Sequence, residues 1–235
     1  MQPQLERQDE CRSPFLKPVR LLERLSPAAR ADLEALLHVS SYPPGMAIFT
    51  EGEAARGIYI VLSGDVRVSI GSADGKRLNL RIVRQGELLG LSSVLSESRY
   101  NATAEALYPA RLAYLGREPL LAFLARHPDA YLPLVEELSR KLSVACGQLR
   151  TVALSHSAPE KLARLLLEWS ENGPSGAGGS IRFTLTHEEI GEFIGASRET
   201  VTRTLASFKR RHLVRFEGSM LTIPDRAALA SQIAE

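Results

Sequence analysis

Residues 186–203 read THEEIGEFIGASRETVTR and carry the clearest local signals in the C-terminal part of the chain. Thr186 is followed three residues later by Glu189, a capping-box pattern that marks the first turn of a helix. Gly195-Ala196 allows a sharp turn, and Ser197 is a favourable N-cap for a second helix. The pattern therefore predicts a helix-turn-helix.

The second of these helices has two chemically different faces. Val201, Leu205 and Phe208 recur at helical spacing and form the stripe expected to be buried. The opposite face carries arginine, the preferred bidentate reader of guanine, and glutamate, which accepts from the cytosine amino group. We therefore expect this face to enter the major groove of DNA. The expected base-reading residues are Arg198, Glu199 and Arg203, and the expected phosphate contacts are Ser197, Thr200, Thr202 and Lys209.

Basic residues gather around the same helix. Between positions 197 and 216 six residues are basic and one is acidic, although the whole chain carries a net charge of only +2. A local basic stripe of this kind is typical of a phosphate-binding face. Residues 213–216 and 220–223, joined by Glu217-Gly218-Ser219, predict a β-hairpin wing beside the helix.

A helical period runs through residues 128–152. Its apolar residues alternate at spacings of three and four, which is the pattern of a coiled-coil seam. The alternative is a helix packed only on its own β-domain, but the sustained heptad spacing favours a seam between two copies of the chain. We therefore expect a homodimer. The seam residues are Val135, Leu138, Leu142, Ala145, Leu149 and Val152.

From residue 42 to residue 115 the hydrophobic period changes to two. The runs 58–62, 66–70 and 78–83 read as strands, and glycines punctuate them every few residues. This cadence predicts a small antiparallel barrel or roll, and hence an α+β chain. The expected domains are a flexible arm at 1–18, a sensor β-roll with flanking helices at 19–127, a dimerisation helix at 128–155 and a winged helix-turn-helix at 156–235. Residues 172–180 are expected to be a surface loop.

Composition and motifs exclude several other classes of protein. Cys11 and Cys146 are far apart, which argues against a disulfide scaffold, and no apolar run is long enough for a signal peptide or a membrane span. We therefore expect a cytoplasmic protein. The sequence contains no HExxH, no GxSxG and no complete phosphate loop, so neither an enzyme nor a metal site is predicted.

Residues 186–191 and 194–203 closely resemble the helix-turn-helix of the Crp/Fnr family of bacterial transcription regulators, with SRETVTR at 197–203 as the most specific string. Gly45, Gly52, Gly64 and the segment 86–90 extend the resemblance into the β-roll. Together these features cover about residues 20–225. The resemblance implies a cyclic-nucleotide-binding-like sensor, TGTGA-like half-sites in an inverted repeat, contact with RNA polymerase and a role as activator or repressor.

The sensor departs from the family members that bind cyclic AMP. Where those members carry Gly-Glu-Leu and Arg-Ser, this chain has Gly90-Leu91-Ser92 and Tyr100-Asn101. Without the arginine a buried phosphate loses its charge-assisted partner, and an unpaired buried anion is costly. Cyclic AMP is therefore not the expected effector. Any effector pocket is expected at Gly90, Leu91, Tyr100, Asn101, Ala145 and Cys146.

Other cofactors can be judged from the ligand residues that the chain offers. An iron–sulfur cluster needs about four cysteine ligands, whereas the chain has two cysteines. His38 and Cys146 are conceivable haem ligands, but lone residues of these types are more often plain core, and we expect Cys146 to be a buried structural cysteine. Haem, a cyclic dinucleotide or another small effector stays open as an alternative.

Overall fold

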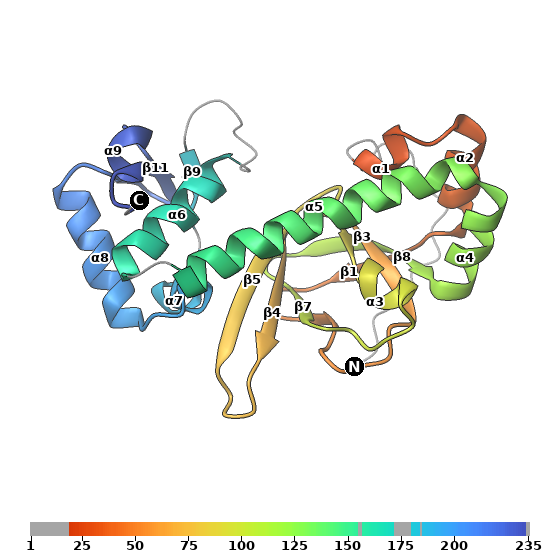
Figure 1. Cartoon of the computed structure of the whole chain (residues 1–235), viewed down its shortest axis with the longest axis horizontal. Helices are drawn as coiled ribbons and strands as arrows, with labels where there is room; N and C mark the ends of the chain where they lie inside the picture. The colour runs from red at the N-terminus through yellow and green to blue at the C-terminus, as the bar shows by residue number, and fades with distance from the viewer. Residues whose placement is uncertain (1–18, 155–156, 172–179, 184, 234–235) are drawn as a thin grey trace. The chain divides into compact units, whose positions relative to one another are not determined.

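The computed structural model describes residues 19–154, 157–171, 180–183 and 185–233 (Figure 1). The chain divides into two compact units, Met1–Ser143 and Val144–Glu235. The predicted arm at 1–18 lies outside the described residues, as does the predicted loop at 172–180 apart from Ser180. None of the described helices is long and apolar enough to cross a membrane.

The first unit is built around two four-stranded antiparallel sheets. Their strand orders are β1-β8-β3-β6 and β2-β7-β4-β5, so the predicted antiparallel roll is confirmed. The long β4–β5 hairpin projects from the roll (Figure 1). The strands are β1 (His38–Tyr42), β2 (Ala47–Phe49), β3 (Gly57–Ser63), β4 (Val66–Gly71), β5 (Arg77–Val83), β6 (Leu88–Leu89), β7 (Thr103–Ala106) and β8 (Ala110–Gly116).

The central strand β3 shows why these runs fold as strands. Ile58, Ile60 and Val61 are almost completely buried, because β3 lies between β8 and β6 inside its sheet. The turn that follows needs Gly64, which has a φ of 82°. A Cβ there would also lie 2.6 Å from the carbonyl oxygen of Pro109. The predicted turn between the two strands is therefore present and requires glycine.

Short helices flank the roll. Ser26 caps the second of them by accepting a hydrogen bond from the amide of Ala29 at 3.3 Å, with Pro27 as the first helical residue. Leu22, Leu33 and neighbouring apolar side chains join the core of the roll. The helices are α1 (Arg20–Glu23), α2 (Pro27–Leu36), α3 (Leu91–Leu95), α4 (Arg117–Arg126) and the 3-10 turn Pro128–Ala130.

The predicted long helix is present as α5 (Tyr131–Leu149), which continues into a π-helical segment, η2 (Arg150–Leu154). All the large hydrophobic side chains that are exposed among the described residues lie on α5. Leu138 behaves differently from its seam neighbours, since it is half-buried against the core of its own roll. The exposed residues are Tyr131, Leu132, Val135, Leu142 and Leu149.

The second unit holds the helix-turn-helix and a small sheet. The predicted wing is confirmed as a hairpin of two antiparallel strands whose turn contains Gly218 at a φ of 58°. A third strand, which the sequence did not suggest, pairs with the second strand of the wing. The elements are α6 (Ala158–Glu171), β9 (Ser180–Arg182), α7 (His187–Ile194), α8 (Arg198–Arg210), β10 (Arg215–Glu217), β11 (Met220–Thr222) and α9 (Arg226–Ala230).

Candidate nucleic-acid interface

Helix α7 begins at a complete capping box. The Thr186 hydroxyl accepts from the amide of Glu189 at 3.2 Å, and the Glu189 carboxylate accepts from the amide of Thr186 at 2.8 Å. Two of the free amides at the helix start are thereby satisfied. Ile190, Phe193 and Ile194 are buried. The first helix of the motif is therefore fixed at its start and along its inner face.

The turn between α7 and α8 depends on two glycines. Gly195 ends α7 in the left-handed conformation, with a φ of 62°. A Cβ on Gly191 would lie 2.4 Å from the carbonyl oxygen of Ala196, so the side chain would collide with the backbone of the turn. The close neighbour of Gly191 is therefore the backbone of the turn.

Helix α8 buries one stripe and exposes the other. Ser197 caps the helix, since its hydroxyl accepts from the amide of Thr200 at 3.3 Å. Val201, Leu205 and Phe208 are buried, as their spacing predicts. Thr204 is buried beside them. Its hydroxyl donates a hydrogen bond to the carbonyl oxygen of Thr200 at 2.8 Å, so this polar group has a partner within the helix.

The predicted base-reading residues are all exposed on α8. The side chains of Arg198, Glu199 and Arg203 are exposed to solvent and are not part of the core. Hydrogen bonds from its own backbone amide and from the Ser197 hydroxyl keep the pKa of Glu199 below its usual value, and Arg198 and Arg203 act in the same direction. Glu199 is therefore ionised and remains an acceptor across the neutral pH range.

The hydroxyls predicted to hold phosphates already have local partners. The Ser197 hydroxyl lies 3.1 Å from that of Thr200, which also accepts from the Arg203 guanidinium at 3.5 Å. Thr202 donates to the carbonyl oxygen of Arg198 at 2.9 Å and lies 2.7 Å from Nδ1 of His187. The sequence did not single out His187, because its partner is fifteen residues further along the chain.

The basic residues that follow on α8 and in the wing also face outward. Lys209, Arg210 and Arg215 are exposed, while the exposed Arg211 donates to the side chain of Gln232 at 2.7 Å. The predicted basic stripe therefore lies on the surface of the second unit. Exposed cationic side chains of this type suit contacts with a phosphate backbone.

The residues expected at the effector pocket are placed very differently from one another. Leu91 is buried, whereas Asn101 is exposed. Tyr100 is buried, donates from its hydroxyl to the carbonyl oxygen of Gly57 at 2.6 Å and stacks on the ring of Phe49. Gly90 has a φ of 77°, and a Cβ there would lie 2.9 Å from the Tyr100 ring. An aromatic side chain thus occupies the position where the resemblance would place an arginine.

The remaining two residues of the expected pocket, Ala145 and Cys146, belong to the second unit, and both are exposed. The expectation that Cys146 is a buried structural cysteine is therefore wrong. It lies on a part of α5 that its own chain does not cover. His38, considered above as a haem ligand, is exposed on β1. Among the described residues no three His, Cys, Asp or Glu side chains come together as metal ligands.

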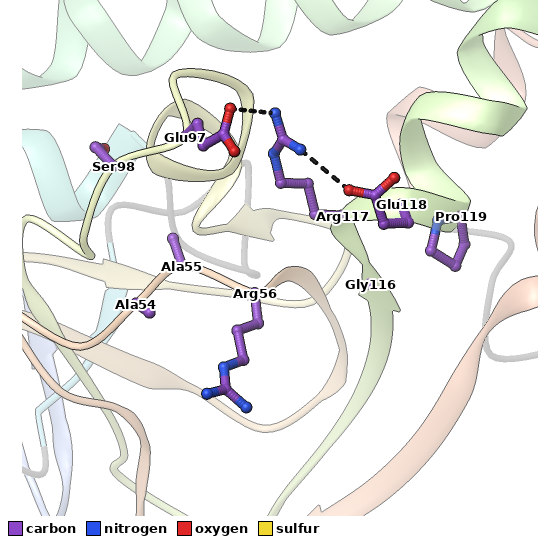
Figure 2. A pocket seen from close by; sticks show the side chains of 9 residues that line it. All are labelled: Ala54, Ala55, Arg56, Glu97, Ser98, Gly116, Arg117, Glu118 and Pro119. Atoms are coloured by element: carbon purple, nitrogen blue, oxygen red, sulfur yellow. Dashed lines mark hydrogen bonds and ion pairs between the residues drawn. The ribbon is translucent and has the colours of Figure 1, made fainter.

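Figure 2 shows a surface pocket of the first unit that none of the expected effector residues line. Arg117 lies beside it and pairs with Glu97 at 3.0 Å and with Glu118 at 3.2 Å, so its charge is already compensated. The lining residues are Ala54, Ala55, Arg56, Glu97, Ser98, Gly116, Arg117, Glu118 and Pro119.

Comparison with known proteins agrees with this architecture. A family model for a Crp-like helix-turn-helix domain matches residues 160–232, and one for a cyclic nucleotide-binding domain matches residues 39–127. The chain is 30% identical over 212 residues to the CRP-like cAMP-activated global transcriptional regulator of Mycobacterium tuberculosis, covering 89% of this chain and 94% of that protein.

Two further relatives support the same assignment. The cyclic AMP receptor protein of Thermus thermophilus is 32% identical over 193 residues, which cover 82% of this chain and 86% of that protein. The structure of FixK2 from Bradyrhizobium japonicum superimposes with a TM-score of 0.76 at 23% identity, covering 85% of this chain and 98% of that one, and so shares the fold. The chain therefore belongs to the Crp/Fnr family of transcriptional regulators, which are not enzymes, and α7 and α8 form the helix-turn-helix of its DNA-binding domain.

Proposed function

We propose that the protein binds as a homodimer to an inverted-repeat operator with TGTGA-like half-sites, and that its sensor does not respond to cyclic AMP. The observation that carries this proposal is the exposed face of α8, where Arg198, Glu199 and Arg203 stand together while the aliphatic stripe is buried. A recognition helix presents just this combination to base edges in the major groove. Ser197, Thr200, Thr202 and Lys209 border the same face and are the proposed phosphate contacts.

The apolar line on α5 supports the dimer. Val135, Leu142 and Leu149 are spaced by seven residues, and their exposed fractions are 58%, 66% and 65%. Large aliphatic side chains this exposed at a-type heptad positions are stabilised by a second helix. Ala145 and Val152 lie at d-type positions of the same seam. Leu138 is shared with the roll, since it packs against the roll's core.

The environment of Tyr100 supports the proposed insensitivity to cyclic AMP. The relatives described above are named as cAMP-activated or cyclic AMP receptor proteins, so cyclic AMP is the first ligand to consider. In this chain, however, the two positions are held by Tyr100 and Leu91, which are buried and carry no charge of their own. Burying a phosphate against an aromatic ring and an aliphatic side chain leaves its charge uncompensated.

The proposal also implies partners and a location. A regulator of this family acts next to RNA polymerase on DNA, so we expect contact with polymerase and a cytoplasmic protein. By its resemblance to related activators, which contact polymerase through loops, we expect this contact at segment 171–180, and that segment lies largely outside the described residues.

Binding to designed duplexes tests the proposal. Fluorescence anisotropy is measured with a duplex carrying two TGTGA-like half-sites, a duplex with one half-site scrambled, and a fully scrambled duplex. Because mismatches cost about 1–3 kcal/mol each, the intact inverted repeat should bind at least about a hundredfold more tightly than the fully scrambled duplex. Equal affinity for all three duplexes would contradict the proposal.

A further inference from the structure

A hydrogen-bonded chain connects the first helix of the motif to the recognition helix. His187 is the first residue of α7, and its Nδ1 lies 2.7 Å from the Oγ1 of Thr202 on the exposed face of α8. The same Oγ1 lies 2.9 Å from the backbone carbonyl oxygen of Arg198. The imidazole of His187 is thus linked through the hydroxyl of Thr202 to the backbone of the recognition helix.

The geometry assigns the hydrogens in this chain. A carbonyl oxygen can only accept, so the Thr202 hydroxyl donates its single hydrogen to Arg198. The hydroxyl then offers only lone pairs to His187, and Nδ1 must carry a hydrogen and donate it. Nδ1 is therefore protonated in both the neutral and the charged ring. The charge of His187 depends on Nε2 alone.

This arrangement matters when DNA approaches. His187 is held against Thr202, which lies on the face that carries Arg198 and Arg203 and that the proposed function turns toward the major groove. The phosphates that border the groove only accept hydrogen bonds. A neutral ring would present the Nε2 lone pair to such an anion, whereas a protonated ring would present a donor and a positive charge.

We propose that His187 is a proton-linked phosphate contact: on binding DNA, each protomer takes up one proton at Nε2 of His187, and Thr202 positions the ring. The proposal rests on the proposed function, because it requires α8 to lie in the groove. The proton comes from solvent and stays on the ring while the phosphate is bound. DNA affinity therefore rises as the pH falls through the range in which histidine titrates.

Charged residues lie on α7 itself and on the elements packed against it. On α7 these are Glu188, Glu189 and Glu192. The carboxylate of Glu189 is engaged in the capping box. Helices α6 and α8 and segment η2 pack against α7. The charged residues on these three elements that have described side chains are Arg150, Glu160, Lys161, Arg164, Glu168, Arg198, Glu199, Arg203, Lys209 and Arg210.

The test is the pH dependence of operator affinity in matched variants. Anisotropy with the intact inverted-repeat duplex is measured from about pH 6 to about pH 8.5, the range that spans histidine titration. His187→Asn keeps an N–H donor for Thr202 but cannot titrate. His212→Asn is the control, since His212 is an exposed histidine of the same unit with a φ of 57°, which asparagine tolerates.

The wild-type affinity should fall by at most about tenfold per protomer for each pH unit within this range, because at most one proton per histidine is linked to binding. The His187→Asn variant should show a flat profile with the affinity of the neutral ring, and His212→Asn should keep the wild-type slope. At low pH the His187→Asn variant should also lose about 0.9 from the slope of log affinity against log salt for each phosphate contact removed.

Two results would overturn the inference. One is a wild-type affinity that depends on pH no more than the affinity of His187→Asn does. The other is a pH dependence of affinity that His187→Asn keeps and His212→Asn removes. Either result, obtained with tight and sequence-specific binding, leaves the proposed function intact. If instead no duplex is preferred at any pH, the proposed function itself is wrong and this inference falls with it.

Discussion

The ring of Tyr100 stacks on the ring of Phe49, with centroids 3.9 Å apart and an angle of 18° between the planes. Phe49 also lies 5.7 Å from Tyr59, which in turn lies 5.1 Å from Tyr114. The aromatic side chains thus form a continuous cluster inside the roll. Tyr100 belongs to the packing of the sensor domain and offers no charge to a ligand.

We therefore predict that cyclic AMP leaves the melting temperature of the protein unchanged. A ligand present at about 100 times its dissociation constant would stabilise the folded state by about 2.7 kcal/mol, which calorimetry detects easily. Thermal unfolding with and without millimolar cyclic AMP is the measurement. A rise of several degrees, matched by tighter operator binding, would contradict the assignment of Tyr100.

The same tyrosine predicts a loss of stability at alkaline pH. Burial raises the pKa of Tyr100 to about 12, with the hydrogen bond to Gly57 acting in the opposite direction. Because the folded-state pKa exceeds the unfolded value, the contribution to stability is complete below about pH 10 and is lost as the pH rises toward about 12. Urea unfolding across this range should show a falling free energy of unfolding.

Tyr100→Phe separates this contribution from those of the other tyrosines. The variant removes the titrating hydroxyl and the bond to Gly57, so it should lose about 1 kcal/mol at neutral pH. Its stability should also fall less steeply than that of the wild type above pH 10. An alkaline slope identical to the wild type would show that Tyr100 is not a source of the pH dependence.

Two glycines of the helix-turn-helix should respond differently to substitution. Gly191→Ala places a methyl group against the carbonyl oxygen of Ala196, and such overpacking costs about 1–3 kcal/mol. Gly195→Asn is the matched control, because Gly195 has open space around it and a φ that asparagine adopts. Thermal unfolding and operator binding should both suffer in the first variant and change little in the second.

The apolar line on α5 predicts a monomer when a charge is introduced. Leu142→Glu and Leu149→Glu place carboxylates on the proposed seam, where two copies would bury them against each other. Ser143→Glu is the control, since Ser143 is exposed on the same helix outside the seam positions. Sedimentation should report dimers for the wild type and the control and monomers for the seam variants. Dimers in all of them would place the interface elsewhere.

Local sequence patterns predicted the helices and strands better than they predicted the contacts between them. The capping box, the turn glycine and the aliphatic stripe of α8 each depend on neighbours within a few residues, and the structure reproduces all three. Strand β9 was missed because its three residues gain order only by pairing with β11, far along the chain. Short strands of this kind carry no period of their own.

Hydrogen bonds between side chains and residues of other elements could not be predicted from the sequence either. Nothing near His187 indicates that it bonds Thr202, and nothing near Tyr100 indicates that its hydroxyl reaches Gly57. Cys146 was expected inside because cysteine is usually buried, whereas it lies on a helix surface that its own chain leaves open. Burial depends on what covers a residue, which spacing alone does not reveal.

We propose that Arg198, Glu199 and Arg203 read bases from the exposed face of α8. Removing one bidentate base contact costs about 1–3 kcal/mol on the cognate site and relaxes the preference for that base. Lys209→Ala, which removes a proposed phosphate contact, should instead weaken binding to all DNA sequences alike. The preferred base sequence of the operator should not change. These two responses distinguish base reading from general attraction to DNA.

The decisive experiment is the selection of bound duplexes from a random pool by the wild type, Glu199→Ala and Lys209→Ala. The wild type and Lys209→Ala should return an inverted repeat of TGTGA-like half-sites about 34 Å apart, one turn of DNA. The Glu199→Ala pool should be degenerate at one symmetric position in each half-site. A Glu199→Ala pool with the wild-type motif, or a wild-type pool without two-fold symmetry, would contradict the account.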